Sequence, residues 1–401
     1  MANVASPRSW LVPVVALFLA TFAICTAELL VAGLLPNIAA DLRTDIPTAG
    51  LLITGYALGV AIAGPLLALV TAALSRRGLL LAVVGVFIVG NILCALSSAY
   101  WMLLGARLVV ACCHGLFFGV GLVLASRLAP PGRQTSAISL VVAGVTLSNI
   151  LGVPIGTAIG NAYGWRAAFW VIAVVGALAL VVLFLLIPKT PDPARGRDDL
   201  RAELRAAVGP AVLQSYAIVV LFMIGVFTLF SYLVPLLTTV SGVPQQYVPW
   251  VLFGMGFCGF FGNLAGGRLG DWNSNVTMIG ILAAVIVLAV VMWQVAGNSW
   301  GMVAVLFASW GIGFGFVAPV QSRILKEAAA APNFASTLIS TAFNLGIATG
   351  AAVGGGAIAA GWGYGVLPLI DAGFLSLSLV ATLLLGAFDR RKRLAAVASP
   401  A

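Results

Sequence analysis

Long stretches of apolar residues recur along the whole chain and constrain its fold more than any other feature. A helix needs about 20 apolar residues to cross the hydrocarbon core of a bilayer. Because lipid offers no hydrogen bonds to the backbone, such stretches are expected to be helical. The sequence therefore predicts an all-α membrane protein with twelve spanning helices, at 11–35, 48–72, 78–98, 101–127, 134–160, 166–188, 212–237, 247–267, 275–296, 300–322, 335–359 and 364–388.

The composition excludes an ordinary soluble domain. Charged residues make up 8% of the chain and apolar residues 62%, with a mean hydropathy of +1.14, whereas soluble domains carry roughly 25% charged residues. The first apolar run is too long for a signal-peptide core, so we expect it to be retained as a spanning helix. The five cysteines lie inside apolar runs without zinc or redox spacing, and we expect neither a disulfide framework nor a metal site.

The basic residues predict the orientation of the chain in the membrane. With the N-terminus inside, 17 of the 20 Lys and Arg residues fall in cytoplasmic segments. Only Arg43 and Arg166 fall outside, and Arg107 lies within a span. The positive-inside rule then places both termini in the cytoplasm, in a bacterial inner membrane. The longest polar stretch, Lys189–Arg205, predicts a linker. The expected domains are an N-terminal six-helix bundle at 1–188, a cytoplasmic linker at 189–210 and a C-terminal six-helix bundle at 211–401.

The two sets of six runs share landmarks in the same order. Leu35-Pro36 corresponds to Val234-Pro235, and we interpret this dipeptide as the end of the first helix of each set. Ile46-Pro47 corresponds to Val243-Pro244, and we interpret this dipeptide as the start of the second helix. The set Asn149, Gly152, Gly156 and Gly160 corresponds to Asn344, Gly346, Gly350 and Gly354. Gly164-Trp165 corresponds to Gly361-Trp362. Their offsets are nearly constant, which predicts a duplicated six-helix unit arranged as parallel repeats.

Several motifs give the chain a resemblance to the major facilitator superfamily over its whole length. The segment Leu34–Leu42 resembles the family's end of helix 1, and Gly262–Asp271 resembles its loop between helices 8 and 9. Helix 4 carries Arg107, as the family does, and the stretch from Gly144 to Gly156 is similar to the helix 5 motif of exporters. The chain thus resembles most closely the branch of twelve-helix drug:proton antiporters.

Within that branch, three segments are similar to chloramphenicol-resistance exporters and to arabinose or purine-nucleoside efflux permeases: Thr26–Glu28, His114–Gly119 and Gly164–Phe169. The resemblance implies proton-coupled efflux of a small amphipathic drug such as chloramphenicol by alternating access. Export of sugars or purine nucleosides is the alternative, and a membrane-embedded enzyme or a channel fits less well. With one histidine, no HExxH and no Walker-type loop, we expect no enzyme activity, no cofactor and no nucleic-acid partner. We expect a monomer whose partners are its substrate, protons and the bilayer.

Four ionisable residues lie inside predicted spans and are the candidates for proton coupling: Glu28, Arg107, His114 and Asp371. Each costs about 2.5–3.5 kcal/mol at the centre of a spanning helix, so such residues usually have a function. Glu28 lies seven residues before the expected end of helix 1, and Arg107 lies seven residues after the start of helix 4. Both should then lie roughly 10 Å below the outer surface, and we expect them to form a pair.

Glu28 is the expected proton carrier, protonated from outside and deprotonated inside. Burial and the nearby cation act on its proton affinity in opposite directions, so opening and closing of the cavity would change that affinity. A static buried ion pair is the alternative. His114 lies two turns from Arg107 on the same face, and either relays protons, binds substrate or bonds a neighbouring helix.

The remaining candidates rest on the expected cavity-lining helices. For substrate binding these are Glu28, His114, Phe118, Asn149, Phe227, Phe230, Tyr232, Trp310, Phe314 and Asn344. An apolar, aromatic cavity with few polar anchors suits an amphipathic molecule, although each aromatic residue has packing as its alternative role. For gating the candidates are Gly152, Pro154, Gly156, Arg268 and Asp271. We expect the glycines of helix 5 and helix 11 to face each other along a seam on which two bundles rock, and structural packing alone is the alternative.

Overall fold

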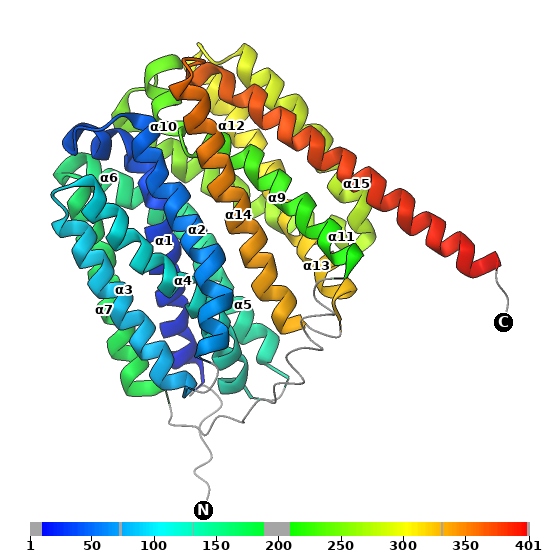
Figure 1. The fold of residues 1–401 in the computed structure, drawn as a ribbon, viewed down its shortest axis with the longest axis horizontal. Coiled ribbons are helices and arrows are strands. Elements are labelled where there is room, and N and C mark those ends of the chain that lie inside the picture. The colour runs from blue at the N-terminus through cyan, green and yellow to red at the C-terminus, as the bar shows by residue number, and fades with distance from the viewer. Residues whose placement is uncertain (1–9, 72–73, 131, 188–208, 330–331, 399–401) are drawn as a thin grey trace, which may run out of the picture. The chain divides into compact units, whose positions relative to one another are not determined.

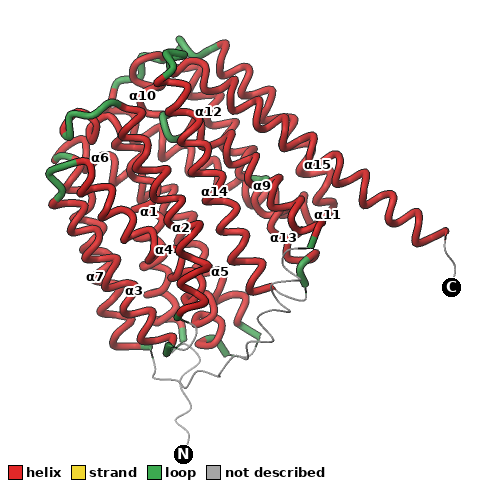
Figure 2. Tube along the Cα trace, in the orientation of Figure 1, coloured by secondary structure: helices red, strands yellow, loops and turns green. Residues whose placement is uncertain are grey.

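The described part of the chain consists of helices joined by short loops. The computed structural model describes residues 10–71, 74–130, 132–187, 209–329 and 332–398, and these ranges contain no strand (Figure 2). The chain divides into two compact units, Met1–Arg195 with Pro244–Gly256, and Gly196–Val243 with Phe257–Ala401. The predicted linker Lys189–Arg205 lies outside the described residues.

The first unit contains the first six spans. Its elements are α1 (Leu11–Asp41), α2 (Ile46–Val70), α3 (Arg76–Leu96), α4 (Tyr100–Leu128), α5 (Gln134–Leu147), the π-helix η1 (Ser148–Gly152), α6 (Val153–Tyr163) and α7 (Trp165–Leu186). Helix α3 lies between α4 and α7, and α1 packs on α5, α6 and α7 (Figure 1).

The second unit contains the remaining spans. Its elements are α9 (Pro210–Phe230), α10 (Leu233–Pro235), the π-helix η2 (Leu236–Val240), most of α11 (Val248–Gln294, preceded by η3, Gln245–Tyr247), α12 (Ser299–Phe314), α13 (Val317–Glu327), α14 (Pro332–Ala359), η4 (Tyr364–Val366) and α15 (Leu367–Ala398). Helix α9 packs on both α14 and α15, as α1 packs on α5, α6 and α7 in the first unit. The same packing scheme in both units agrees with the predicted duplication.

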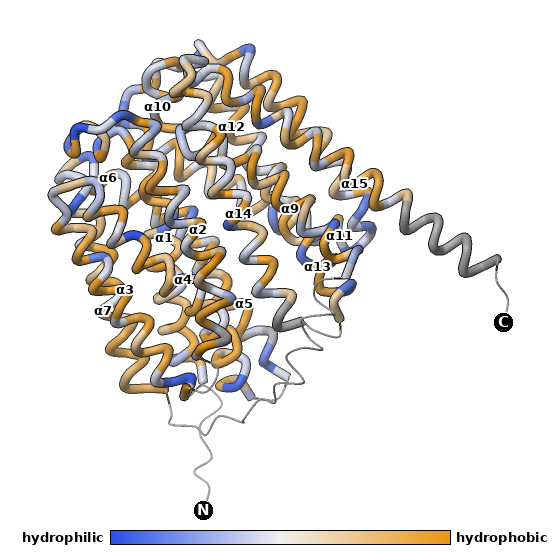
Figure 3. Tube along the Cα trace, viewed as in Figure 1, coloured by the Kyte–Doolittle hydropathy of each residue, from blue (hydrophilic) through white to orange (hydrophobic). Residues whose placement is uncertain are grey.

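Eleven helices of the described residues are long and apolar enough to cross a membrane. The longest, Gln245–Gln294, contains the non-helical residue Asn273 and is therefore two helices in sequence, which makes twelve spans. Apolar residues, orange in Figure 3, cover long stretches of many of the helices. Many large apolar side chains are exposed, among them Trp101, Leu178, Trp250 and Leu384. Exposed apolar surface on this scale suits contact with lipid, and the prediction of an all-α protein with twelve spans is confirmed.

Two helix ends differ from prediction, and proline is the reason. Helix α1 continues through Pro36 to Asp41, and a helical course resumes after a turn at Tyr232 and passes through Pro235 to Val240. Proline removes one backbone hydrogen bond and usually ends a helix in a soluble protein. In a spanning helix, packed neighbours satisfy the freed carbonyl, so the helix continues.

The glycine stripes also differ from prediction. Side chains added at Gly152 and Gly156 would meet Thr26 and Leu30 of α1. Those added at Gly346 and Gly350 would meet Met223 and Ile224 of α9. Each stripe is thus covered by the first helix of its own unit, and the expected seam in which the two stripes face each other was wrong. The glycines let two backbones approach closely within one unit.

This packing predicts opposite outcomes for two glycines of α14. A Cβ at Gly350 would lie 2.5 Å from the Ile224 carbonyl oxygen, whereas a Cβ at Gly356 meets nothing within 4 Å. We expect Gly350→Ala to destabilise the protein by about 1–3 kcal/mol through overpacking. Gly356→Ala should be neutral or slightly stabilising, because alanine is the better helix former. Thermal unfolding of the detergent-purified variants checks this, and equal midpoints would contradict the packing described here.

Candidate functional site

A buried arginine joins three helices at the centre of the first unit. Arg107 of α4 is 1% exposed. Its Nη1 donates to the Ala27 carbonyl at 2.7 Å, its Nη2 to the Glu28 carbonyl at 3.2 Å, and its Nε to the Leu52 carbonyl at 3.4 Å. The guanidinium carbon also lies 4.3 Å from the centre of the Tyr56 ring. These contacts satisfy the cation inside the span and hold α1 and α2 against α4.

The single histidine lies beside this arrangement. The Nδ1 atom of His114 lies 3.2 Å from the Tyr56 hydroxyl and 3.8 Å from Oε2 of Glu28. The Glu28 side chain is 13% exposed, and its Oε1 atom is buried without a hydrogen-bond partner. Glu28 and Tyr56 therefore both lie on the Nδ1 side of His114, with a hydrogen bond between His114 and Tyr56 and with the Arg107 guanidinium over the Tyr56 ring.

The structure brings Glu28 and Arg107 together, although by different atoms from those expected. Arg107 bonds the backbone carbonyl of Glu28, and the carboxylate faces His114 instead. Within the described residues no ion pair joins Arg107 to that carboxylate, so the expected side-chain pair was wrong. The depth expected for Glu28 assumed a helix end at Leu35, whereas α1 ends at Asp41.

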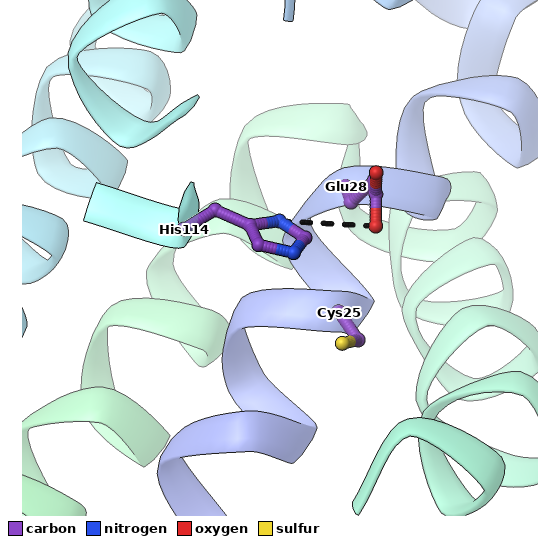
Figure 4. A group of neighbouring side chains, drawn as sticks. All are labelled: Cys25, Glu28 and His114. Atoms are coloured by element: carbon purple, nitrogen blue, oxygen red, sulfur yellow. Dashed lines mark ion pairs between the residues drawn. The ribbon is translucent and has the colours of Figure 1, made fainter. Parts of the chain in front are cut away.

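Cys25 completes this group and was missed by the sequence analysis. The ligand atoms of Cys25, Glu28 and His114 all lie within 4.8 Å of one another. Figure 4 shows the imidazole of α4 directed toward the face of α1 that carries the other two side chains. The three-residue spacing of Cys25 and Glu28 places them one turn apart on the same face and was the available signal. Nothing local to the sequence indicated Tyr56.

A second polar cluster holds the end of α1. Arg166 donates from Nη1 to Oδ2 of Asp41 at 2.6 Å and from Nη2 to the Ser97 carbonyl at 2.7 Å. The Trp165 indole donates to the same Asp41 oxygen at 3.1 Å. Nearby, the Thr48 side chain and backbone hold the pKa of the Asp45 carboxyl below its usual value, and Asp45 caps the start of α2. These contacts give Arg166 and Asp41 a structural role.

Asp371 lies in the second unit. It is 4% exposed on α15, and its Oδ1 atom is buried without a partner. It faces α9 at Gly225, where an added Cβ would lie 2.7 Å from that oxygen. The glycine makes room for the carboxyl group between the two helices.

The aromatic candidates of the second unit form one continuous row. Ring centroids lie 5.5 Å apart for Phe227 and Phe230, 4.9 Å for Phe230 and Trp310, and 5.6 Å for Trp310 and Phe314. The row joins α9 to α12. Gly259 of α11 lies against Trp310 and Phe314, where an added Cβ would lie 3.3 and 3.2 Å from these two side chains.

The other substrate candidates have partners of different kinds. Tyr232 is fully buried and donates to the Ala351 carbonyl at 2.8 Å, which anchors α14. Asn149 and Asn344 each donate to the carbonyl four residues earlier, at 2.9 and 3.0 Å. Oδ1 of Asn344 is buried without a partner. Phe118 packs on His114 with ring centroids 5.2 Å apart.

The gating candidates fall at two irregular places. Residues Ser148–Gly152 form a π-helix directly before Pro154. Because Pro154 has no N–H to donate, the regular hydrogen-bond ladder cannot continue there, and the N–H of Val153 bonds the Ser148 carbonyl instead. Arg268 and Asp271 are exposed on α11, just before the break at Asn273.

Comparison with known proteins decides the family. Residues 17–351 match the profile of the Major Facilitator Superfamily. The chain belongs to this superfamily.

Individual relatives agree with that assignment. This transporter is 37% identical over 371 residues to the inner membrane transport protein YdhP of Escherichia coli K12, covering 92% of this chain and 94% of that protein. It is 32% identical to the transporter AraJ of the same organism, covering 96% and 97%. It is 35% identical to the MFS-type transporter YtbD of Bacillus subtilis, covering 85% and 87%.

A solved structure shares the fold. A bacterial homologue of the human lysosomal transporter Spinster matches with a TM-score of 0.63 and 14% identity, covering 95% of this transporter and 99% of that chain. At this identity the match concerns the fold alone. The predicted resemblance to the superfamily is confirmed, and this is a multi-pass helical membrane protein of a family that transports small molecules.

The contacts of Arg107 predict that its shape matters as well as its charge. Lysine keeps the charge but lacks the fork of donors that reaches three carbonyls. We expect Arg107→Lys to lower the unfolding free energy by about 1.5–3 kcal/mol, the value of one hydrogen bond to a charged group. The control is Arg77→Lys, because Arg77 is half-buried and donates to the carbonyl of Phe184, whereas Arg107 is fully buried and reaches three carbonyls. Denaturant or thermal unfolding in detergent checks this, and an equal loss in both variants would count against it.

Proposed function

We propose that this transporter exports a small amphipathic molecule, of the type of chloramphenicol, in exchange for protons by alternating access. The observation that carries the proposal is the Glu28 carboxyl group inside a spanning helix. One of its oxygens is buried without a partner, and the other faces His114 at 3.8 Å. A carboxyl group placed in this way is suited to take up and release a proton.

The cost of charge inside the membrane supports this role for Glu28. An ionised carboxylate without full hydrogen bonding is costly away from water, and it becomes neutral when it takes a proton. Arg107 keeps a fixed positive charge nearby, because its guanidinium is held by the carbonyls of Ala27, Glu28 and Leu52. A change in water access therefore changes the balance between the charged and the neutral form. The hydrogen-bonded pair of His114 and Tyr56 lies next to it, with Nδ1 of His114 3.8 Å from the carboxylate.

The substrate class is inferred from the row Phe227, Phe230, Trp310 and Phe314. Aromatic side chains offer large apolar contact areas, and a few polar groups orient the ligand. The exposed fraction of Phe227 and Phe230 is below 10%, while Trp310 and Phe314 are partly exposed. A flat, amphipathic molecule fits this side-chain set.

A sugar or nucleoside is the second candidate, and Asn344 favours it. Its Oδ1 atom is buried without a partner, so it can accept a hydrogen bond from a ligand hydroxyl or amine.

We also propose that the chain acts without a cofactor, catalyses no chemical reaction, works as a monomer and has both termini in the cytoplasm. Asp371 remains a second proton-coupling candidate, in the other unit.

The central test compares the wild type with Glu28→Gln. In an efflux-deficient host, we expect the wild type to raise resistance to chloramphenicol or a similar compound, and a protonophore to remove that resistance. Glu28→Gln should reduce resistance to the level of a host without the transporter, because the amide cannot exchange a proton. The matched control is Asp45→Asn, an exposed carboxyl at the start of α2, which should keep resistance.

Two results would decide against the proposal as stated. Full proton-coupled export by Glu28→Gln would show that Glu28 is not the carrier. Export of sugars or nucleosides in vesicles, without resistance to any drug, would establish the second candidate instead.

The aromatic row gives a separate prediction. We expect Trp310→Ala to raise the KM for the exported compound about 2- to 12-fold, as a contact worth ~0.5–1.5 kcal/mol predicts. Trp300→Ala is the control, because this indole is 87% exposed. Transport into inverted vesicles at varied substrate concentration measures both, and unchanged KM in Trp310→Ala would remove the row from the substrate site.

A further inference from the structure

We propose that Cys25, Glu28 and His114 form a binding site for one divalent transition-metal ion of the type of Zn²⁺. Their ligand atoms lie within 4.8 Å of one another, and among the described residues this is the one such group of three. Two ligands come from consecutive turns of α1 and the third from α4. The contacts of Arg107 with α1 hold these two helices together.

The chemistry of the three donors selects the ion. A thiolate, an imidazole and a carboxylate are the ligands that Zn²⁺ prefers, with bonds of about 2.0–2.3 Å. Around one tetrahedral ion such atoms lie roughly 3–4 Å apart, and a pair at the 4.8 Å limit of the group would need to close by about 1 Å to reach that spacing. Three protein ligands leave a fourth position open, as in zinc sites that exchange a ligand.

The surroundings orient the ligands. The Tyr56 hydroxyl lies 3.2 Å from Nδ1 of His114, and it can accept the N–H proton there. That arrangement leaves Nε2 as the free ligand, and a hydrogen bond of this kind is usual for metal-binding histidines. Figure 4 shows the ring with one nitrogen toward Glu28 and the other on the side of Cys25. The unpartnered Oε1 of Glu28 offers a further acceptor for the ion.

The charge at this place sets a condition on the ion. Arg107 lies close by and repels a cation, although its donors are directed to carbonyl oxygens of Ala27, Glu28 and Leu52. Two negative ligands, the carboxylate and the thiolate, offset the two charges of the ion. Binding therefore requires the Cys25 thiol to lose its proton, which passes to water.

An ion bound here would occupy the Glu28 carboxylate and the His114 imidazole, and its effect on transport rests on the proposed function of these groups in proton exchange. Bound Zn²⁺ should therefore inhibit proton-coupled transport by excluding protons from the site.

Cobalt provides the direct test. Co²⁺ replaces Zn²⁺ in such sites, and a bond to a thiolate gives a charge-transfer absorption that reports cysteine ligation. The full chain is purified without a polyhistidine tag and titrated with Co²⁺. Because the sequence contains one histidine, any histidine ligand in the tag-free chain is His114. We expect one ion per chain with the thiolate absorption, and competition by Zn²⁺.

Variants assign the ligands. Cys25→Ser should remove the thiolate absorption and weaken Co²⁺ binding more than about tenfold, and His114→Gln should weaken binding likewise. Cys94→Ser is the control, because Cys94 is a buried thiol in α3 of the same unit, and it should bind as the wild type does. The thermal midpoint of each variant shows that it is folded. Absence of the absorption in the wild type, or its persistence in Cys25→Ser, would overturn the proposal.

A transport measurement separates this inference from the proposed function. Zn²⁺ inhibition is expressed relative to each variant's own metal-free rate, and it should weaken in Cys25→Ser but not in Cys94→Ser. Full activity of Glu28→Gln would contradict the proton-carrier proposal. The metal proposal would still be decided by cobalt binding to the wild type. Failure of the wild type to bind cobalt would contradict the metal proposal. The proton-coupling proposal would still be decided by the transport activity of Glu28→Gln.

Discussion

A charged group that is fully buried in a membrane-spanning bundle must find its partners inside the protein. Arg107 meets this constraint with the carbonyls of Ala27, Glu28 and Leu52 and with the Tyr56 ring. Its contacts set how α4 lies against α1 and α2, and therefore where the side chains of α1 are placed. Because backbone carbonyls take up the donors, the Glu28 carboxylate is left free of the guanidinium. That freedom is what makes the carboxylate available to protons or to a cation.

Close helix contacts supply the rigidity that this arrangement needs. The glycines at 152 and 156 bring η1 and α6 against α1, on the helix that carries Glu28. The second unit repeats the device with Gly346 and Gly350 of α14 against α9. Large side chains at these places would separate the helices, whereas lipid provides little force that drives them together. In each unit the first helix, α1 or α9, thus packs closely against a glycine-bearing helix. Both of these first helices carry residues proposed to act in transport.

The sequence predicted the spans well and the atomic contacts poorly, for a physical reason. Hydropathy records the thickness of the bilayer, so the twelve runs fall on the observed helices. It does not record whether neighbours satisfy a carbonyl freed by proline, and the ends expected at Pro36 and Pro235 were wrong. Counting residues along helices placed Arg107 near Glu28 but could not say which oxygen it bonds. Cys25 was missed because metal motifs are defined by short spacings, while its neighbour His114 lies on another helix.

The proximity of Arg107 also bears on which cations the proposed Glu28 site would accept. A lone carboxylate beside a fixed positive charge offers little to a hard ion such as Mg²⁺ or Ca²⁺, which prefers several oxygen ligands. A proton needs one oxygen and no coordination sphere, so the proposed proton exchange at Glu28 would meet little competition from these abundant ions. A borderline ion gains from the thiolate of Cys25 and the imidazole of His114, which hard ions do not use. The same positive charge that holds the helices together would therefore favour, at this proposed site, protons and metals that bind sulfur and nitrogen.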